Sequence, residues 1–322
     1  MLSTKDSVLS ELMKSPGNAV SGAELARDLK VTRNAVWKAV SSLKNDGYNI
    51  LSTAKGYALR GECDIINKQR ICEYIQTDGY CVHMYDSVDS TNNVLKKLAQ
   101  SGAPELSAVI AREQTAGRGR LGRSFFSPKD SGIYVSVLLR PVLAASDALK
   151  ITTAVAVVVS QAIESVLNIK TGIKWVNDIY YGSRKVCGIL TEASVDLESA
   201  GIEYAVVGIG VNVEPPEGGF PDEISSTADS LCVCGKADVK NRLVAGILDG
   251  IAQARSRLTD GSYVTEYKAR SILKGKSVAV IKQGGETDAL VLGIDDDFRL
   301  EVEYNDKRRE SLSSGEVRIK LK

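Results

Sequence analysis

The chain has 322 residues, 43% of them hydrophobic and 25% charged, and its formal net charge is +1. This composition is typical of a folded globular protein, and it excludes a disordered chain or one attracted to nucleic acid over its whole surface. The length exceeds that of one ordinary hydrophobic core, so we expect two or three domains. Residues 1–14 carry charges throughout, and the longest apolar run, Ile151–Val159, is shorter than the roughly 20 residues of a membrane helix. The sequence therefore predicts a cytoplasmic protein with no membrane partner.

Residues 1–62 are predicted to form a winged helix-turn-helix. Ser21 is predicted to form a capping box with Glu24 at the start of one short helix, and Thr32 to cap the next. Two short strands then surround Lys55. The segment Ser21–Val40 would be the helix-turn-helix itself, with its second helix in the major groove of DNA. The side chains expected to contact DNA are Arg33, Asn34, Lys38 and, in the wing, Lys55.

A small helical domain that makes protein contacts would show the same helical pattern. Residues 1–62 hold nine lysines and arginines against six acidic residues, so the local charge favours DNA. The predicted wing favours DNA further.

From residue 65 to 273, helices and buried strands follow one another in irregular order, which is typical of α+β rather than of a doubly wound sheet. The predicted helices are Thr91–Gln100, Asp147–Leu167 and Val239–Leu258. The predicted strands are Val109–Glu113, Ile133–Leu139, Ile173–Tyr181, Lys185–Ala193 and Tyr204–Val213. Residues 274–322 show only short strands separated by turns, which predicts a small β-barrel. We therefore expect three domains: 1–62, 65–273 and 274–322.

Two glycine-containing segments are candidates for ligand-binding loops. Gly117–Arg123 alternates glycine with arginine between two strand-like segments, which suits a loop that closes over a polyanion, but it lacks the Gly-Lys-Ser/Thr ending of a P-loop. Gly208–Val213 lacks the third glycine of the dinucleotide fingerprint and falls inside a predicted strand. Neither segment indicates NAD or an ordinary ATPase, and the glycines of Gly208–Val213 are expected to permit close approach of a neighbouring group or ligand.

A set of cations with one carboxylate could bind a nucleotide. Asp178 follows Lys174 by four residues, so on one strand the two side chains would share a face, and Asp178 could hold a Mg²⁺ that bridges phosphates. An exposed cross-strand ion pair is the alternative. His83 is the only histidine, so no Ser-His-Asp or Cys-His set is available. Transfer of AMP to a carboxylate fits, because it needs only positioning and charge neutralisation. The candidate cations are Arg118, Arg120, Arg123, Lys174 and Lys185.

Together these stretches closely resemble the bifunctional biotin–protein ligases, the biotin operon repressors of bacteria, over nearly the whole chain. The resemblance implies a winged helix-turn-helix, a central mixed α/β ligase domain of the class II synthetase-like kind and a C-terminal SH3-like β-barrel. The motifs that carry it follow in the family's order: Asp89-Ser90-Thr91-Asn92, Gln114 with Gly117–Arg123, Lys174–Asp178, Lys185–Leu190, Gly208–Val213 and Ser314-Gly315-Glu316.

The resemblance implies biotin–[acetyl-CoA-carboxylase] ligase activity. Biotin and ATP, with Mg²⁺, would give biotinyl-5′-AMP, and the biotinyl group would pass to a lysine of the biotin carboxyl carrier protein of acetyl-CoA carboxylase. By motif position, biotin would be bound by Ser90, Thr91, Asn92, Gln114, Arg118, Gly119, Arg120 and Lys185. The nucleotide would be bound by Arg118, Arg120, Arg123, Lys174, Asn177 and Asp178. Lys185, Arg118 and Arg120 would be the catalytic residues, and Asp178 the metal ligand.

The resemblance also implies a switch between two tasks. Retained biotinyl-AMP would order the glycine-rich loops and favour a homodimer, whose two winged helices would bind the operator of biotin genes. Two alternatives remain open: a biotin-sensing DNA-binding regulator with little ligase activity, and a relative of the lipoate–protein ligases, which share the central architecture.

Overall fold

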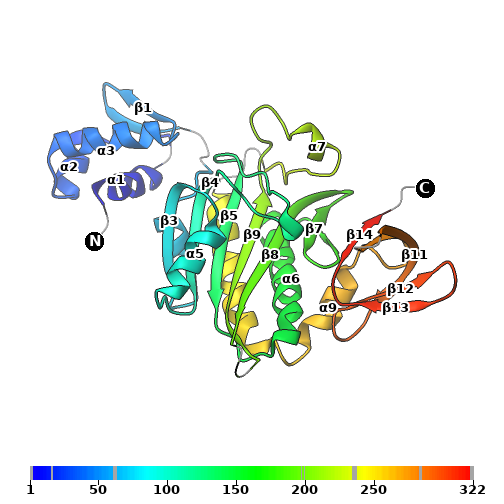
Figure 1. The fold of residues 1–322 in the computed structure, drawn as a ribbon. Coiled ribbons are helices and arrows are strands. Elements are labelled where there is room, and N and C mark those ends of the chain that lie inside the picture. The colour runs from blue at the N-terminus through cyan, green and yellow to red at the C-terminus, as the bar shows by residue number, and fades with distance from the viewer. Residues whose placement is uncertain are drawn as a thin grey trace. The chain divides into compact units, whose positions relative to one another are not determined.

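The computed structural model describes residues 3–15, 17–60, 64–196, 198, 200–233, 238–282 and 285–319 (Figure 1). The chain divides into two compact units, which are described separately. The first consists of Met1–Glu73 with Gly235–Asn241, and the second of Tyr74–Cys234 with Arg242–Lys322. The C-terminal section thus belongs to the same unit as the central sheet, and the three-domain division stays a prediction.

The first unit begins with three helices and a two-stranded hairpin, as predicted. Thr32 caps α3, because its hydroxyl accepts a hydrogen bond from the backbone N–H of Ala35 at 3.1 Å. Ser21 caps α2 through the N–H of Ala23 at 3.2 Å, one residue earlier than a capping box with Glu24 would require. The elements are α1 (Thr4–Met13), α2 (Gly22–Asp28), α3 (Arg33–Asn45), β1 (Ile50–Thr53), β2 (Gly56–Leu59) and α4 (Lys68–Tyr74).

The core of this unit is formed by apolar side chains at helical spacing. Leu12 of α1, Leu25 of α2, and Val36 and Leu43 of α3 are all buried in one cluster, which Ile50 of the hairpin completes. The opposite face of α3 is therefore left to solvent. The predicted winged helix-turn-helix arrangement is confirmed.

The second unit is built on a seven-stranded mixed sheet. Its strand order is β3-β4-β5-β9-β8-β7-β6, with β3 parallel to β4 and every other neighbouring pair antiparallel. This confirms the predicted α+β class, although strand β3 was not predicted. The strands are β3 (Cys81–Val88), β4 (Ser107–Gln114), β5 (Gly132–Leu139), β6 (Gly172–Lys174), β7 (Asp178–Tyr181), β8 (Arg184–Val195) and β9 (Ile202–Asn212).

The predicted strand Ile173–Tyr181 is wrong. It is a hairpin in which β6 and β7 pair antiparallel and Trp175–Asn177 form the turn. Lys174 and Asp178 therefore lie opposite each other on adjacent strands, not four residues apart on one strand. The error arose because Trp175 and Val176 are both buried, so the turn is as apolar as the strands around it.

The helices of this unit include two that were not predicted from the sequence, α7 and α9. Helix α6 has the length and hydropathy of a membrane span over Ala145–Leu167, but most of that window is buried. Its apolar residues are buried because the helix packs against β8, β6 and α9 and against Gly246 and Gly250 of α8. The helices are α5 (Thr91–Gln100), α6 (Ala148–Leu167), α7 (Asp222–Ser225), α8 (Val239–Ala254) and α9 (Ser262–Arg270), with 3₁₀ turns η1 (Arg120–Gly122), η2 (Ala145–Asp147) and η3 (Arg255–Arg257).

The C-terminal section is a five-stranded antiparallel sheet of order β13-β12-β11-β10-β14, so its first and last strands are neighbours. Among the described residues β13 and β14 remain its two edges. A hydrogen bond of 2.8 Å from Nε1 of Trp175 to the carbonyl of Phe298 ties this sheet to the β6–β7 turn. The strands are β10 (Ser277–Lys282), β11 (Gly285–Ile294), β12 (Leu300–Tyr304), β13 (Arg309–Leu312) and β14 (Glu316–Ile319).

Candidate functional site

The exposed face of α3 carries the predicted DNA-binding side chains. Arg33, Asn34 and Lys38 are all exposed, and so is Lys55 at the tip of the β1–β2 hairpin. Trp37, which the sequence reasoning did not select, lies on the same face and is 57% exposed. The face therefore offers cations, an amide and an aromatic ring without a covering element in its own unit.

In the second unit, a buried polar cluster forms where α5 begins. The side chains of Thr91 and Asn92 are each 3% exposed. Oε1 of Gln114 accepts from the backbone N–H of Thr91 at 2.9 Å and from its hydroxyl at 3.0 Å, and Nε2 donates to Ser127 at 2.9 Å. The hydroxyl of Ser136 lies 2.8 Å from Oγ1 of Thr91 and 2.6 Å from Oδ1 of Asn92.

These contacts orient both amides. Both oxygen lone pairs of Gln114 are used, so the group that it can offer a ligand is its second N–H. The amide nitrogen of Asn92 donates to the carbonyl of Leu190 at 3.3 Å and to Glu192 at 2.8 Å. Asn92 can therefore offer a ligand only a lone pair on Oδ1, as a hydrogen-bond acceptor. The cluster is thus prepared to bind a small group with one acceptor and one donor.

Glycines of β8 and β9 form the floor beside this cluster. Gly208 pairs with Leu190, and Gly210 pairs with Gly188. A Cβ atom added at Gly208 would overlap with Oδ1 of Asn92, and one added at Gly210 would overlap with the ring of Phe125. Because only glycine admits these contacts, the expectation that the glycines permit close approach is confirmed for neighbouring side chains.

The arginines of the β4–β5 loop point to different elements. Nη1 of Arg118 lies 3.1 Å from Oε1 of Glu192, and Nη1 of Arg120 donates to Oδ1 of Asn177 at 3.0 Å. Arg123 forms a 2.5 Å ion pair with Glu316 of β14. Figure 1 shows the corresponding path, with the loop running from β4 across the sheet toward β7. It is held to β8, to the β6–β7 turn and to the C-terminal sheet.

Lys185 and Asp178 form the charged centre of the second unit. Nζ of Lys185 lies 2.7 Å from Oδ1 of Asp178, and the two side chains are partly exposed, at 30% and 21%. Lys174 lies opposite Asp178 in the hairpin, and burial lowers the pKa of its amine, with the negative charge of Asp178 acting in the other direction. An anion that entered here would face the positive charges of two lysines, Lys174 and Lys185.

One hollow unites most of the predicted nucleotide-binding residues. Gly315 and Glu316 of the C-terminal sheet form one wall. Lys185 also reaches toward the glycine floor, since a Cβ added at Gly188 would lie 3.1 Å from its Nζ. Arg118 is not among the lining residues, because its side chain turns toward Glu192. The predicted residues that line the hollow are Gly119, Arg120, Arg123, Lys174, Asn177, Asp178 and Lys185.

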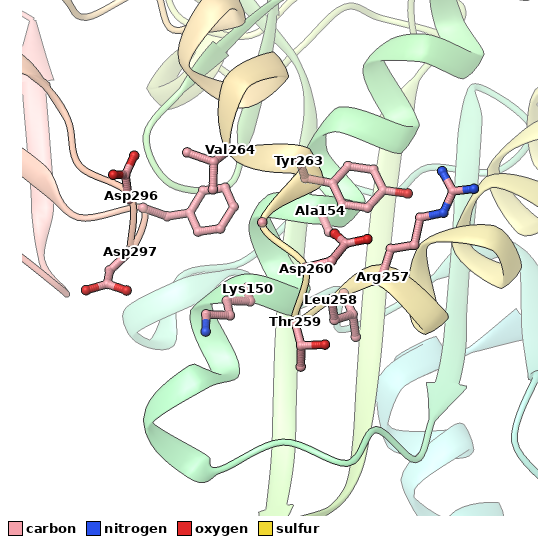
Figure 2. Close-up of a pocket in the computed structure, with 12 residues that line it drawn as sticks. Lys150, Ala154, Arg257, Leu258, Thr259, Asp260, Tyr263, Val264, Asp296 and Asp297 are labelled. Atoms are coloured by element: carbon pink, nitrogen blue, oxygen red, sulfur yellow. The ribbon is translucent and has the colours of Figure 1, made fainter.

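A separate cavity of about 200 Å³ contains none of the predicted site residues. Figure 2 shows Arg257, Asp260 and Tyr263 on one side of it and Asp296 and Asp297 of the C-terminal sheet on the other. Charged side chains of both signs line it. We assign it no ligand.

Comparison with known proteins places the chain in a family. Residues 84–212 match the Biotin/lipoate A/B protein ligase family, and residues 4–58 match the HTH domain. The chain is 32% identical to the Bifunctional ligase/repressor BirA of Bacillus subtilis (strain 168) over 95% of this chain and 96% of that protein. The chain belongs to the bifunctional biotin–protein ligase/repressor family.

Further members and structures agree with this membership. The Bifunctional ligase/repressor BirA of Escherichia coli (strain K12) is 31% identical over 61% of this chain and 60% of that protein. Biotin protein ligase from Aquifex aeolicus, in complex with biotin and ATP, superposes with a TM-score of 0.63 at 26% identity and covers 75% of this chain and 99% of that one. The family thus accounts for both units of the chain.

Three residues that contact the candidate site were not selected from the sequence. Ser136, Ser127 and Glu192 contact Asn92 or Gln114 directly. A signal existed for two of them: Ser136 interrupts the otherwise apolar strand Gly132–Leu139, and Glu192 is the one acid in Arg184–Val195. A polar side chain in a buried strand needs a hydrogen-bond partner, so Ser136 and Glu192 could have been selected as candidate members of a polar cluster.

Ser90 precedes helix α5, next to Thr91 and Asn92 in the chain. It is 2% exposed and is the N-terminal capping position of α5, yet its side chain makes no capping hydrogen bond. Its role in binding biotin stays a prediction, as do the roles of the other site residues.

Proposed function

We propose that this chain is a biotin–protein ligase that activates biotin with ATP and transfers it to a carrier protein lysine, and that its helix-turn-helix represses transcription. The observation that supports the ligase proposal is that two candidate binding sites lie next to each other on one sheet. One is the polar cluster, with a free acceptor on Asn92 and a free donor on Gln114. The other is the hollow that holds Lys174 and Lys185.

Each place suits one part of the substrates. The ureido ring of biotin carries a carbonyl acceptor and N–H donors, which match Gln114 and Asn92. Lys185 reaches from the hollow to Gly188, at the glycine floor beside that cluster. The carboxylate of biotin and the phosphates of ATP would therefore meet at Lys185.

Two steps follow from this placement. The biotin carboxylate attacks the α-phosphate of ATP, the bond to the leaving phosphate breaks, and pyrophosphate departs. The amine of the carrier lysine then attacks the acyl carbonyl of biotinyl-AMP, loses a proton, and expels AMP. Lys185 neutralises charge that develops on the phosphate in the first step and polarises the acyl carbonyl in the second. Arg118 and Arg120 would close over the adenylate.

Incubation of the chain with ATP, biotin and an isolated biotin carrier domain tests the ligase proposal. We expect the acceptor to gain the mass of one biotinyl group. No mass gain, with biotin binding intact, would favour a biotin-sensing regulator. A mass gain with lipoate but not with biotin would favour a lipoate ligase.

Magnesium would enter this site with the phosphates of ATP. Among the described residues no group of three or more His, Cys, Asp or Glu side chains is placed to hold a metal ion. Asp178 and Glu316 are the two carboxylates that line the hollow, which suits an ion that takes one or two carboxylates and otherwise phosphate oxygens and water. When bound, Mg²⁺ would neutralise phosphate charge, and Asp178 would be its ligand from the protein.

Replacing Asp178 with asparagine should raise the Mg²⁺ concentration needed for half-maximal release of pyrophosphate several-fold, because the amide keeps the shape but loses the charge. Asp147→Asn removes a carboxylate of an ion pair outside the hollow, with Lys150, and should leave the Mg²⁺ dependence unchanged. An identical Mg²⁺ titration for Asp178→Asn and the parent would remove Asp178 from the metal site.

For the first unit we propose that α3 reads an operator of biotin genes and that biotinyl-AMP favours the homodimer that binds it. The exposed Arg33, Asn34 and Lys38 of α3 support this proposal, together with the match to the HTH domain. A two-fold dimer would place two such helices on two half-sites.

Replacing Arg33 with alanine should weaken binding to a DNA duplex from upstream of the biotin synthesis genes by roughly 5- to 150-fold, the size of one lost base or phosphate contact of about 1–3 kcal/mol. Fluorescence anisotropy measures this, and ligation by the same variant should be unchanged. Lys14→Ala, at the end of α1, is the control. A joint loss of DNA binding and ligation in Arg33→Ala would contradict separate tasks for the two units.

A further inference from the structure

Glu192 lies at the centre of the polar cluster, although no feature of the proposed reaction requires an acid there. It stands on β8, and its side chain is 23% exposed. Its carboxylate receives three donors: Nδ2 of Asn92 at 2.8 Å, Nζ of Lys96 at 2.9 Å and Nη1 of Arg118 at 3.1 Å. One side chain thus links α5 to the β4–β5 loop.

The carboxylate stays charged in this place. Burial by itself would raise the pKa of Glu192, but the hydrogen bonds from Asn92 and Lys96 and the charge of Arg118 outweigh burial and lower it. An ionised carboxylate can accept hydrogen bonds but cannot donate them. Of the two ends of the Asn92 amide, only the nitrogen can therefore face Glu192.

This restriction determines which atom of the Asn92 amide faces a ligand. With its nitrogen held by Glu192 and by the carbonyl of Leu190, its Oδ1 must face Ser136 and the glycine floor at Gly208. Asn92 is thereby fixed as an acceptor. Without Glu192 the nitrogen would keep only the longer hydrogen bond to Leu190, at 3.3 Å, so the amide would be held less firmly against turning over to present an N–H, which would repel the N–H of a ureido ring.

We propose that Glu192 is a positioning residue for biotin binding, which acts by fixing the amide of Asn92 as a hydrogen-bond acceptor. The inference rests on the proposed function, because it takes the ureido ring of biotin as the ligand of Asn92. Glu192 touches neither the nucleotide hollow nor its lysines, since the lining of that hollow does not include it. Arg118 is the one proposed nucleotide-binding residue that Glu192 contacts, and it lies outside the lining of the hollow, so loss of Glu192 should weaken the binding of biotin far more than the binding of ATP.

Calorimetric titration of the full chain with biotin alone, and separately with ATP alone, tests this assignment. Glu192→Ala should weaken biotin binding by about ten-fold or more and leave ATP binding within about two-fold, the change expected when one buried hydrogen bond of about 1.4 kcal/mol is lost. Glu192→Gln keeps an oxygen that can accept from Asn92 and should restore most of the biotin affinity.

Lys96→Ala is the matched control. It removes another partner of the same carboxylate but contacts neither Asn92 nor Arg118 in the described structure, so its biotin affinity should stay within about two-fold of the parent. Equal loss in Lys96→Ala and Glu192→Ala, or parallel loss of biotin and ATP binding, would show a structural role and overturn the assignment. If the parent chain and Glu192→Ala bind biotin equally well, the role of Glu192 is overturned but the proposed function is not. A parent chain that binds no biotin overturns the proposed function as well.

Discussion

Replacing Lys185 with alanine should slow the formation of biotinyl-AMP by roughly 100- to 1000-fold, the usual loss when one preorganised group that stabilises transition-state charge is removed. The reason is its position between Asp178, at 2.7 Å, and the glycine floor at Gly188. Release of pyrophosphate in single-turnover experiments with saturating biotin and ATP measures the effect.

The fold should survive this change. The backbone N–H of Lys185 donates to the carbonyl of Thr227 at 2.8 Å, and its carbonyl accepts from the N–H of Asp229 at 2.9 Å, so β8 is held there without the side chain. Loss of a partly exposed ion pair costs at most about 1 kcal/mol, or a few degrees in melting temperature. Lys150→Ala, which breaks the comparable pair with Asp147, should show the same small change in melting temperature and full activity. Turnover near that of the parent in Lys185→Ala would remove Lys185 from the mechanism.

Replacing Gly208 with alanine should weaken biotin binding by roughly ten- to a hundred-fold, or about 1.4–2.8 kcal/mol. The added methyl group would occupy the place of Oδ1 of Asn92, so Asn92 must move away from Ser136 and lose its orientation. Calorimetry with biotin measures the affinity, and ATP binding provides an internal reference.

Gly246→Ala is the control for adding a methyl group to a partly buried glycine. In α8 a Cβ at this position would meet the methyl group of Ala162 at 3.6 Å, an ordinary contact, and alanine favours a helix. This variant should bind biotin like the parent and melt at the same temperature or higher. Normal biotin affinity in Gly208→Ala would mean that Asn92 and the glycine floor do not belong to the biotin site.

The first unit could be predicted almost completely because its signals are local. Thr32 caps α3 through a residue three positions away, and the apolar stripe of Val36 and Leu43 follows the helical period. Within residues 1–62 the capping partner of Ser21 differed, and helix α4, which follows them, was not predicted. Strands β3 and β13 and helices α7 and α9 were missed because their short or mixed patterns do not stand out from loop sequence.

Most residues that line the candidate site were selected from the sequence, but their arrangement was not. Lys174, Asp178 and Lys185 were selected as charged groups in apolar surroundings, yet the hairpin at Trp175–Asn177 decides that Asp178 pairs with Lys185 and faces Lys174. That hairpin depends on burial of Trp175 and on its hydrogen bond to Phe298, a residue 123 positions away. No pattern within the segment contains this information.

By itself, the sequence determined the family, the helix-turn-helix and the inventory of polar and cationic groups, because motif order and helical caps are properties of neighbouring residues. The tertiary structure alone decided which amide is donor and which is acceptor, since Asn92 meets Glu192 and Ser136 from strands about 100 and 44 residues away. The orientation of a side-chain amide depends on partners that the fold brings together, and only the folded chain supplies them.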